Sequence, residues 1–508
     1  SARAAVAYSS SSGGPVVSKI FISYKRDREL DDTVARTLHD HFGQEHEVFI
    51  DQRIAPGTNW ARRLEQELRS SDFVFLLLSA DSVLSEMVRG EIELVRSIKA
   101  SERPTIIPIR IAFTGQLPYP LNAFLDPLQW VMWSGPDDDP ELLRQVGAAL
   151  ANEDLELGER ASVSSVARLP KAPAAAASPP IASEDVYIER PGEAQRLQAI
   201  RDDRANTLHV VGPRHMGKTR FIDRLANAAE EAGKLVVRID FKLFDAESLA
   251  DLRSLCAALC DWFAEDLEVD PPAEGYWNRG LVPRRCLKFM AKSLGAAGSH
   301  VVLVLDEVER VLQTKGKNDF FGMLRALHEE RKQVRSAFKQ LDLVLVASMN
   351  LHRATGDAHQ SPFNVGQRFE LVDFDRSQVQ QLARAMGLSL STPACERLHA
   401  LLGGHPLLTQ RALAAHRDGT ITFDSDTAVD ELLQSRSPFA DHMRWCSFSL
   451  EQLSEAELRA FRASLRNGRG LDPDLFWRLE GSGFVRGTYK QPVPRCELYA
   501  AFFTAGGQ

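Results

Sequence analysis

The stretch "VVGPRHMGKTRF", residues 210–221, decides the fold of the larger part of this 508-residue chain. Within it, Gly212 to Thr219 match the pattern GxxxxGK[ST], after the apolar run "TLHVV" and before the helical pattern "TRFIDRLANAA". A loop of this kind between a strand and a helix cradles phosphates with its backbone N–H groups, while Lys218 adds a positive charge and the Thr219 hydroxyl binds Mg²⁺. The stretch therefore predicts a nucleoside triphosphate, ATP or GTP, at the edge of an α/β sheet.

Two stretches further along the chain supply the other groups that such a site needs. In "VVLVLDEVER", residues 301–310, a strand ends in two acids: Asp306 is the expected Mg²⁺ ligand, and Glu307 the expected base that aligns water for ATP hydrolysis. Asn350, at the tip of "VLVASMN", is expected to sense the γ-phosphate. The alternative is a strand that ends in two acids without a function. The remaining loop residues are expected to contact the nucleotide as well: Gly212, Pro213, Arg214, His215, Met216, Gly217 and Arg220.

Five stretches together resemble the STAND class of AAA-like NTPases, which are signal-transducing ATPases with numerous domains. They are "VYIERPGE" (186–193), "GPRHMGKT" (212–219), "LDEVE" (305–309), "SPFNVGQRFEL" (361–371) and "LLGGHPLLTQ" (401–410). The resemblance implies that Tyr187 and Arg190 lie against the nucleotide base. It also implies that the turn formed by Gly404, His405 and Pro406 touches bound ADP and locks a resting state. Without the resemblance, a glycine that caps a helix, followed by a proline, explains this turn better.

Strand-like runs also alternate with helical patterns near the N-terminus: "KIFISY", "EVFID", "FVFLLLS" and "TIIPIRI". The alternation predicts a parallel sheet covered on both faces, and one helix carries Trp60, Leu64 and Leu68 as a buried stripe. This part resembles a TIR domain across residues 18–152. The matching residues are Phe21, Ser23 and Tyr24 in the first strand, Pro56, Gly57 and Trp60 in "DQRIAPGTNW", and Ser85 to Glu91, where Met87 and Val88 replace the family's Trp-Cys pair.

Some TIR domains cleave NAD⁺ between nicotinamide and ribose, whereas others are adhesive scaffolds. Departure of nicotinamide gives an oxocarbenium-like transition state, which one carboxylate can stabilise or trap. The resemblance implies that Glu91 is this acid. Glu86 on the same helix is the alternative, and acids on a helix face, Glu93 among them, are commonly only solvated. The residues expected to bind NAD⁺ are Phe21, Ser23, Tyr24, Lys25, Arg26 and Trp60, of which Trp60 is equally explained as a core residue.

Shifts in composition and pattern divide the chain into six parts. The segment rich in Ala, Ser and Pro between the two α/β patterns is the clearest linker. The expected parts are a disordered leader (1–17), a flavodoxin-like TIR domain with a parallel sheet (18–152), the linker (153–185), a P-loop NTPase core of the ASCE or AAA-like type (186–372), a helical lid (373–440) and a winged-helix domain (441–508).

Charge and composition limit the partners of the protein. A net charge of −8 and a pI near 6.0 give no general attraction to nucleic acid or to an anionic membrane. No apolar run approaches the roughly 20 residues that a bilayer requires, and the N-terminus lacks the pattern of a signal peptide. The six cysteines form no paired framework, and Cys256 and Cys260 are expected to pack in a core rather than bind a metal. Together these features predict a cytoplasmic protein.

The expected function combines the two resemblances. ATP-dependent oligomerisation of the NTPase would cluster TIR domains that cleave NAD⁺ to nicotinamide and ADP-ribose or cyclic ADP-ribose, as in bacterial antiphage immunity. The expected ligands are ATP or ADP with Mg²⁺, turned over slowly, and NAD⁺ as substrate; the expected partners are further copies of the chain and a separate trigger protein or ligand. One alternative is a TIR scaffold without chemistry. The other is an ATP-dependent regulator whose winged helix binds DNA through Arg486, Lys490 and Arg495.

Overall fold

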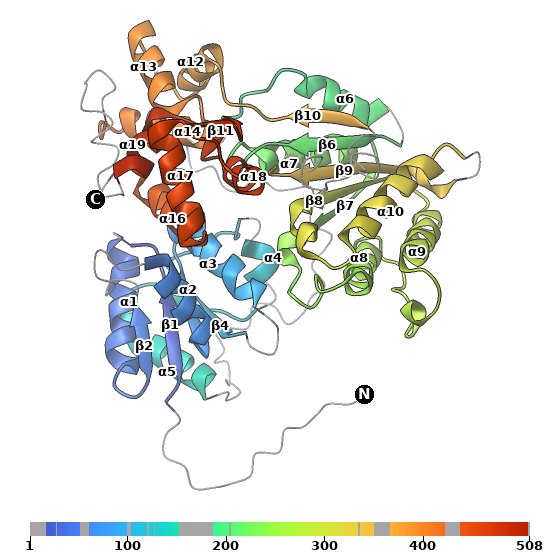
Figure 1. Cartoon of the computed structure of the whole chain (residues 1–508). Helices are drawn as coiled ribbons and strands as arrows, with labels where there is room; N and C mark the ends of the chain where they lie inside the picture. The colour runs from blue at the N-terminus through green and yellow to red at the C-terminus, as the bar shows by residue number, and fades with distance from the viewer. Residues whose placement is uncertain are drawn as a thin grey trace. The chain divides into compact units, whose positions relative to one another are not determined.

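The chain divides into two compact units, one of residues 1–95 and 101–167 and the other of residues 96–100 and 168–508. Figure 1 follows both along the chain by colour. The predicted linker, and the predicted leader apart from Val17, lie outside the described residues. The computed structural model describes residues 17–26, 28–50, 60–98, 103–118, 121–125, 128–151, 186–202, 205–333, 336–349, 366–421 and 437–505.

The N-terminal unit contains a five-stranded parallel sheet in the order β2-β1-β3-β4-β5. This is the flavodoxin-like order that the sequence predicts. Along the chain its elements are β1 (Lys19–Ser23), α1 (Glu29–Phe42), β2 (Glu47–Ile50), α2 (Trp60–Ser70), β3 (Phe73–Leu78), η2 (Ser82–Leu84), α3 (Glu86–Ser97), β4 (Thr105–Ile111), α4 (Leu121–Leu125), β5 (Val131–Trp133), η4 (Pro136–Asp138) and α5 (Asp139–Leu150).

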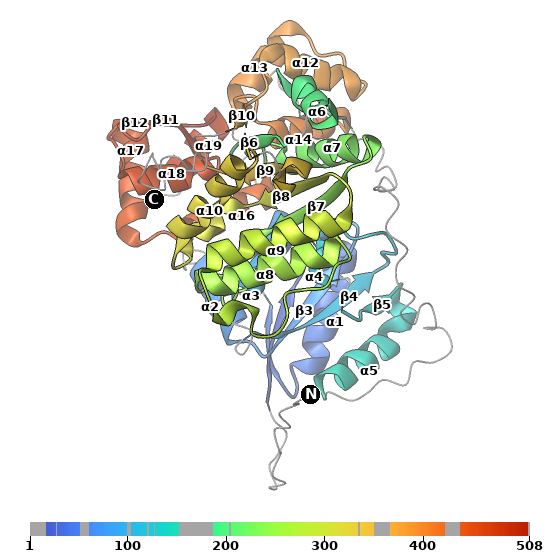
Figure 2. The same ribbon diagram turned by 90° about the vertical axis from the view of Figure 1, so that its right-hand side faces the viewer.

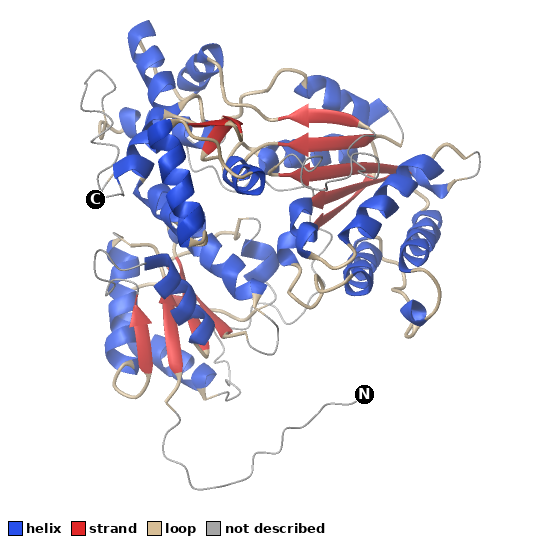
Figure 3. Cartoon of the chain, viewed as in Figure 1, coloured by secondary structure: helices blue, strands red, loops and turns tan. Residues whose placement is uncertain are grey.

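Helices flank both faces of this sheet (Figure 3), so its strands carry apolar side chains on both faces. Ile20 and Ile22 of β1 pack with Leu38 of α1 and Leu142 of α5 in one core. Side chains alternate along a strand, so Ser23 points to the opposite face from Ile22. Leu64 and Leu68 of α2, two members of the predicted stripe, are fully buried.

The strand order determines where this sheet can hold a ligand. From β1 the chain first adds β2 on one side and then continues with β3 on the other side of β1. Loops that leave the carboxyl ends of β1 and β3 therefore diverge to opposite sides, which opens a crevice where α/β proteins of this order bind their ligands. Ser23 ends β1 and Ser79 follows β3 at this edge.

The larger unit contains a second parallel sheet, in the order β10-β6-β9-β8-β7. Strand β9 lies between β6, which leads into the P-loop, and β8, which ends in the two acids, as expected of an ASCE-type core. Its elements are α6 (Glu193–Asp202), β6 (Thr207–Val211), α7 (Lys218–Glu231), β7 (Leu235–Asp240), η5 (Phe241–Leu243), α8 (Leu252–Asp266), η6 (Tyr276–Asn278), α9 (Val282–Ala297), β8 (Val301–Asp306), η7 (Val308–Gln313), α10 (Lys317–Glu330), η8 (Ala337–Gln340), β9 (Leu341–Ala347) and β10 (Gln367–Glu370).

Two cores cover the faces of the second sheet. Helices α8, α9 and α10 supply one of them, and α8 lies beside α9 in Figure 2. Helices α6 and α7 supply the other. The six cysteines are buried and form no disulfide, and Cys256 and Cys260 belong to the core under α8 and α9, as expected from their sparse spacing.

Helices dominate the rest of the larger unit, and the structure ends in an antiparallel hairpin and a last helix. Two helices followed by a hairpin are the order of a winged helix; that assignment and the bounds of the six predicted parts stay predictions. None of the helices in the described parts of the chain is long and apolar enough to cross a bilayer. The elements are α12 (Arg376–Ala385), α13 (Thr392–Leu402), α14 (Pro406–Arg417), α16 (Ala440–Glu451), α17 (Glu455–Asn467), α18 (Pro473–Gly481), β11 (Val485–Thr488), β12 (Gln491–Pro494) and α19 (Glu497–Ala505).

A buried ion pair joins β9 to the residue before β7. Lys234 Nζ lies 2.8 Å from Asp342 Oδ2, and the two side chains are 6% and 1% exposed. We expect Asp342→Ala to lower the free energy of unfolding by roughly 3–5 kcal/mol, because it leaves the buried ammonium without its carboxylate. Urea denaturation measures this. The double variant Lys234→Met/Asp342→Leu should lose less free energy of unfolding, because it leaves no buried charge. Equal losses in the single and the double variant would show that the unpaired ammonium is not the cause.

Candidate functional site

The N-terminal unit brings together two of the predicted site residues. Ser23 Oγ, at the end of β1, donates a hydrogen bond to the carboxylate of Glu91 on α3, 68 residues further along the chain. Both side chains are buried, and Glu91 is 5% exposed. The pair lies at the carboxyl edge of the sheet, where proteins of this strand order bind their ligands. Val88, which stands where the family has cysteine, is fully buried on the same helix.

The other residues predicted to bind NAD⁺ occupy different environments. Lys25 is half-buried, and its Nζ donates to the backbone oxygen of Asp81 at 3.3 Å. Phe21 is fully buried and stacks on Phe49 with ring centroids 5.5 Å apart. Tyr24 packs into the core under α1, while Arg26 is half-buried. Trp60 begins α2, but its side chain lies outside the described residues. Contact of these residues with NAD⁺ stays a prediction.

A second buried carboxylate at this edge is absent from the predictions. Asp31, in the first turn of α1, is 2% exposed and accepts a 3.0 Å hydrogen bond from Ser79 Oγ. Burial raises the pKa of Asp31 to about 6, although Ser79 and the backbone of Lys25 oppose the rise by hydrogen bonding to the carboxylate. The sequence gives no signal for it, because acids are common in the first turn of a helix.

The P-loop has the geometry that phosphate binding requires. Helix α7 begins at Lys218, after Gly217 with a φ of 89° and His215 with a φ of 65°. A Cβ on Gly212 would lie 3.0 Å from the Cβ and the backbone oxygen of Leu371, so any other residue there would require Leu371 to shift. Lys218 Nζ donates to the backbone oxygens of Gly212 at 2.7 Å and Pro213 at 3.1 Å. Burial lowers the pKa of Lys218, and the neighbouring acids oppose this change.

The two predicted acids lie at the end of β8, and each is paired with a cation. Asp306 Oδ2 lies 3.0 Å from Arg238 Nη2, and Asp306 Oδ1 accepts the backbone N–H of Glu307 at 3.0 Å. Glu307 has a φ of 54° and pairs with Lys242 at 3.0 Å. Although burial opposes it, the charges of Lys242, Arg214 and Lys218 hold the pKa of Glu307 well below its usual range. Glu307 is therefore ionised; its role as the base for hydrolysis stays a prediction.

A third acid joins this site without having been predicted. Glu309 Oε1 accepts hydrogen bonds from both the backbone N–H, at 2.9 Å, and the hydroxyl of Ser348, just beyond β9. Burial and the charge of Glu307 raise the pKa of Glu309 to about 7. Only its position two residues after Glu307 in "DEVE" distinguishes it in the sequence. Asn350, predicted to sense the γ-phosphate, lies outside the described residues.

The donor set beside the P-loop suits Mg²⁺. Thr219, the second residue of α7, presents an exposed hydroxyl, and Asp306 presents a carboxylate at the end of β8. Mg²⁺ prefers such oxygen ligands together with phosphate oxygens and water. Thr219 and Asp306 would hold the ion, which when bound neutralises charge on the nucleotide phosphates.

The segment before α6 supports the P-loop from a second direction. Arg190 Nη2 donates to the backbone oxygen of Met216 at 3.0 Å, and its guanidinium lies 4.3 Å from the centroid of the Phe374 ring. Glu193, which is fully buried, accepts hydrogen bonds from Tyr187 Oη at 2.9 Å and from the backbone N–H of Arg190 at 3.0 Å. The structure thus places Arg190 against the P-loop backbone. Contact of Tyr187 or Arg190 with a base stays a prediction.

The turn between α13 and α14 has the form of a helix stop. Gly403 caps α13 with a φ of 63°, and the buried Pro406 begins α14. The turn is also joined to the P-loop, since the backbone oxygen of Gly404 accepts the N–H of Phe374 at 2.8 Å, and Phe374 packs on Arg190. Arg220, the last predicted contact, donates to the backbone oxygen of Val186 at 3.2 Å. Contact of Pro406 with ADP stays a prediction.

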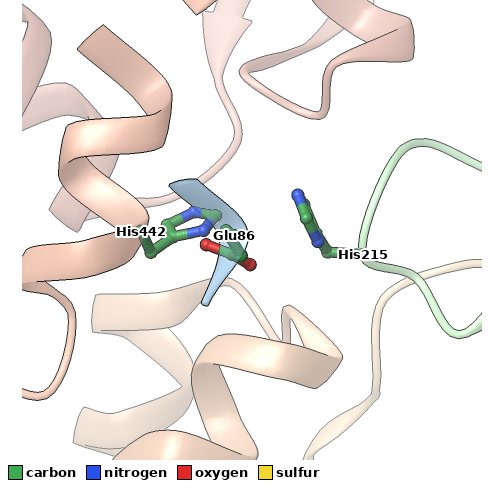
Figure 4. A group of neighbouring side chains, drawn as sticks. All are labelled: Glu86, His215 and His442. Carbon is green, nitrogen blue, oxygen red and sulfur yellow. The ribbon is translucent and has the colours of Figure 1, made fainter. Parts of the chain in front are cut away.

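Helix α16 and the residue that follows β12 also pack on the P-loop. The His215 ring meets the rings of His442 at 5.4 Å and Trp445 at 4.6 Å, both edge to face (Figure 4 shows the two histidines). Arg495 is 6% exposed, pairs with Asp373 at 3.0 Å and donates to Met216 Sδ at 3.5 Å. Arg495, which the DNA-binding alternative places on the surface, is therefore buried against the P-loop.

Two glycines with similar backbone angles allow a test of the turn. Gly404 has a φ of 75°, and a Cβ there would lie 2.0 Å from the backbone oxygen of Phe374; Gly419 has a φ of 73° with nothing within 4 Å. We expect Gly419→Ala to lower the free energy of unfolding by only about 1–2 kcal/mol, which is the cost of placing a residue with a Cβ in the left-handed conformation. Gly404→Ala should lower the free energy of unfolding further, because its Cβ collides with the backbone of Phe374. It should also weaken nucleotide binding, because Phe374 packs on Arg190 beside the P-loop. Melting temperature and titration with a fluorescent ATP analogue measure both effects; equal behaviour of the two variants would contradict the link.

Comparisons with known proteins agree with this arrangement. The model of the AAA-like domain family matches residues 176–505, and that of the TIR domain family matches residues 20–146. No curated protein matches the chain.

Several solved structures resemble the chain distantly. The ORC2 protein of Aeropyrum pernix, in its ADPNP–ADP complexes, is 15% identical over 64% of this chain and 97% of that chain, with a TM-score of 0.36. Cdc6p from Pyrobaculum aerophilum is 14% identical over 64% and 96%, with a TM-score of 0.34. NtrX from Brucella abortus in complex with ATP is 14% identical over 89% and 92%, with a TM-score of 0.28.

Proposed function

Because this chain belongs to the AAA-like domain family and carries a TIR domain ahead of its AAA-like domain, we propose that it is a cytoplasmic, nucleotide-gated NAD⁺ glycohydrolase. In this proposal, ATP drives the AAA-like parts of several copies to assemble, and the gathered TIR domains cleave NAD⁺ to nicotinamide and ADP-ribose or cyclic ADP-ribose. Such an enzyme would act in bacterial antiphage defence by depleting NAD⁺ or by producing a signal.

The observation that carries this proposal is the pair formed by Ser23 and Glu91. Its carboxylate comes from α3, its hydroxyl from the end of β1, and both lie beside the crevice where this strand order places a ligand. The Ser23 hydroxyl orients the carboxylate. Because Glu91 is only 5% exposed, its negative charge acts in a medium of lower dielectric than water and stabilises a neighbouring cation more strongly.

The proposed reaction needs only such a charge. The bond between ribose C1′ and the nicotinamide nitrogen breaks, and its electron pair leaves with nicotinamide, which becomes neutral. The positive charge that develops on the ribose is stabilised by the carboxylate of Glu91. Water then adds to C1′ and releases one proton, which gives ADP-ribose. For a cyclic product, an adenine nitrogen attacks C1′ in place of water, and the alkylated base releases the proton from its amino group.

The geometry of the P-loop supports ATP as the gating ligand. Lys218 donates to the carbonyls of Gly212 and Pro213, and a phosphate offers this buried ammonium a charged partner. His215 and Met216, in the same loop, contact Trp445 and Arg495 of the C-terminal segment. A phosphate that reshapes the loop therefore changes the contacts that hold the C-terminal helices. Slow hydrolysis by Glu307 would return the loop to its resting form.

Assembly would act on the TIR domains through concentration. Residues 153–185 are the predicted linker. A random coil of about 30 residues spans on the order of 30 Å. Under this prediction, tethered TIR domains of neighbouring copies would meet at an effective concentration of about 1 mM. To change an assembly equilibrium from 1:99 to 99:1, the ligands must supply roughly 5.5 kcal/mol of differential binding energy. We propose that ATP supplies part of this energy and that a separate trigger protein or ligand supplies the rest.

The proposal is tested by incubating the full chain with NAD⁺, Mg²⁺ and either ATP or ADP over a range of protein concentrations. Light scattering reports assembly, and chromatography reports nicotinamide. We expect the rate per chain to rise with assembly, and to rise at lower protein concentration with ATP than with ADP. Equal rates from monomers and oligomers would refute gating by assembly.

A scaffold that recruits other TIR proteins is the second candidate. The replacement of the family's Trp-Cys pair by Met87 and Val88 favours it, because this change lies in the helix that carries Glu91. Assembled chains that release no nicotinamide under any nucleotide condition would exclude the enzyme, and binding of a second TIR protein to these assemblies would then support the scaffold.

A further inference from the structure

Three contacts tie together the two loops that border the crevice of the N-terminal sheet. Lys25 Nζ donates to the backbone oxygen of Asp81 at 3.3 Å, and Arg28 Nε lies 3.1 Å from Asp81 Oδ2. The side chains of Arg28 and Asp81 are about half exposed, so their ion pair contributes little. The third contact is the buried one: Ser79 Oγ donates to Asp31 Oδ1 at 3.0 Å.

Asp31 binds both loops with one carboxylate. It accepts the hydroxyl of Ser79, from the loop after β3, and it is also hydrogen-bonded by the backbone of Lys25, in the loop after β1. Ser79 and Ser82 are joined in turn, since the N–H of Ser79 donates to Ser82 Oγ at 2.6 Å and the N–H of Ser82 donates to Ser79 Oγ at 3.1 Å. This turn leads directly into α3, the helix that carries Glu91.

We propose that Asp31 is a positioning residue of the NAD⁺ site. It fixes the loop that carries Lys25 and Arg26 against the loop that leads to α3. The positive charges of the first loop and the carboxylate of Glu91 are thereby held toward one dinucleotide, whose pyrophosphate is negatively charged and whose ribose becomes positive. The inference rests on the proposed cleavage of NAD⁺. Asp31 takes no part in bond breaking, because it lies on the α1 side of the sheet and Ser23 points to the other side.

The raised pKa of Asp31 agrees with a role in positioning the two loops rather than in stabilising the fold. Burial raises its pKa to about 6, Asp81 adds to the rise, and Lys25 opposes it. The folded chain therefore binds the proton more tightly than the unfolded chain, whose carboxyl group titrates near 4. As the pH rises through the interval between these values, ionisation of Asp31 lowers the stability of the fold. A carboxylate that destabilises the fold at neutral pH is expected where function needs it.

The test compares Asp31→Asn with Asp32→Asn in the full chain. Both remove one charge from the first turn of α1, but only the first replaces one acceptor oxygen of the buried anchor by a donor. In ATP-assembled protein at pH 8, we expect Asp31→Asn to raise the KM for NAD⁺ by roughly tenfold to a hundredfold, with a smaller change in kcat. Amide hydrogen exchange should rise only in residues 24–28 and 79–82, and the Tm should not fall. Asp32→Asn should behave as the wild type.

Each outcome decides the inference. Wild-type KM and wild-type exchange in Asp31→Asn would overturn it. A lower Tm with faster exchange throughout the N-terminal unit would also overturn it, because that pattern belongs to a merely structural residue. If the wild type itself releases no nicotinamide, the proposed function fails. The exchange measurement then still decides whether Asp31 holds the two loops, so the two failures are distinguishable.

Discussion

Glu91→Gln should reduce nicotinamide release by the ATP-assembled chain about a hundredfold or more. Glutamine has the shape of glutamate, and its amide oxygen can still accept the hydrogen bond from Ser23 Oγ, so the fold and the assembly should persist. The amide has no negative charge, however, and cannot stabilise the cationic ribose of the transition state. Initial rates by chromatography measure the loss, and light scattering on the same samples verifies assembly.

Two other glutamates on α3 provide the controls. Glu93→Gln makes the same chemical change two residues further along the helix, and we expect at least half of the wild-type rate. Glu86→Gln tests the alternative acid for NAD⁺ cleavage. If Glu91→Gln cleaves NAD⁺ at the wild-type rate and Glu86→Gln does not, the assignment of the acid is wrong, although the proposed reaction stands.

Sequence reasoning placed Ser23 and Glu91 in one site because a family motif marks each of them and a parallel sheet gathers its carboxyl ends at one edge. The structure confirms the sheet and shows the two side chains in contact. Asp31 could not be found in this way. Its partner Ser79 is 48 residues away, and nothing local distinguishes an acid that caps a helix from one that ties two loops together.

In the larger unit, too, the local motif is predictable from the sequence, whereas contacts between residues far apart along the chain are not. The P-loop is a local motif, and its strand, turn and helix lie where the sequence predicts them. The side chains that support it come from elsewhere: Arg190 lies 26 residues before Met216, and Arg495 lies 279 residues after it. Arg495 appeared as one of several cations near a predicted hairpin. Its burial depends on how the last helices pack, which periodicity does not specify.

Lys218→Ala should raise the Kd for ATP by roughly tenfold to a hundredfold, because a charge-assisted hydrogen bond contributes about 1.5–3 kcal/mol. Lys218 donates to the carbonyls of Gly212 and Pro213, and its burial lowers its pKa. A phosphate gives the ammonium a better partner, and alanine removes that gain. At ATP concentrations near the wild-type Kd, the variant should neither assemble nor release nicotinamide. Isothermal titration and light scattering measure the two steps separately.

Lys292→Ala is the matched control, because Lys292 is exposed on α9 and its loss changes the net charge equally. It should bind ATP and assemble as the wild type does. The TIR site of Lys218→Ala is untouched, so at protein concentrations high enough to force assembly without ATP, this variant should cleave NAD⁺ at the wild-type rate per assembled chain. If Lys218→Ala instead assembles at the ATP concentrations that suffice for the wild type, phosphate binding at the P-loop does not gate the TIR domains. The contacts of His215 and Met216 with the C-terminal segment would then serve only to stabilise the fold.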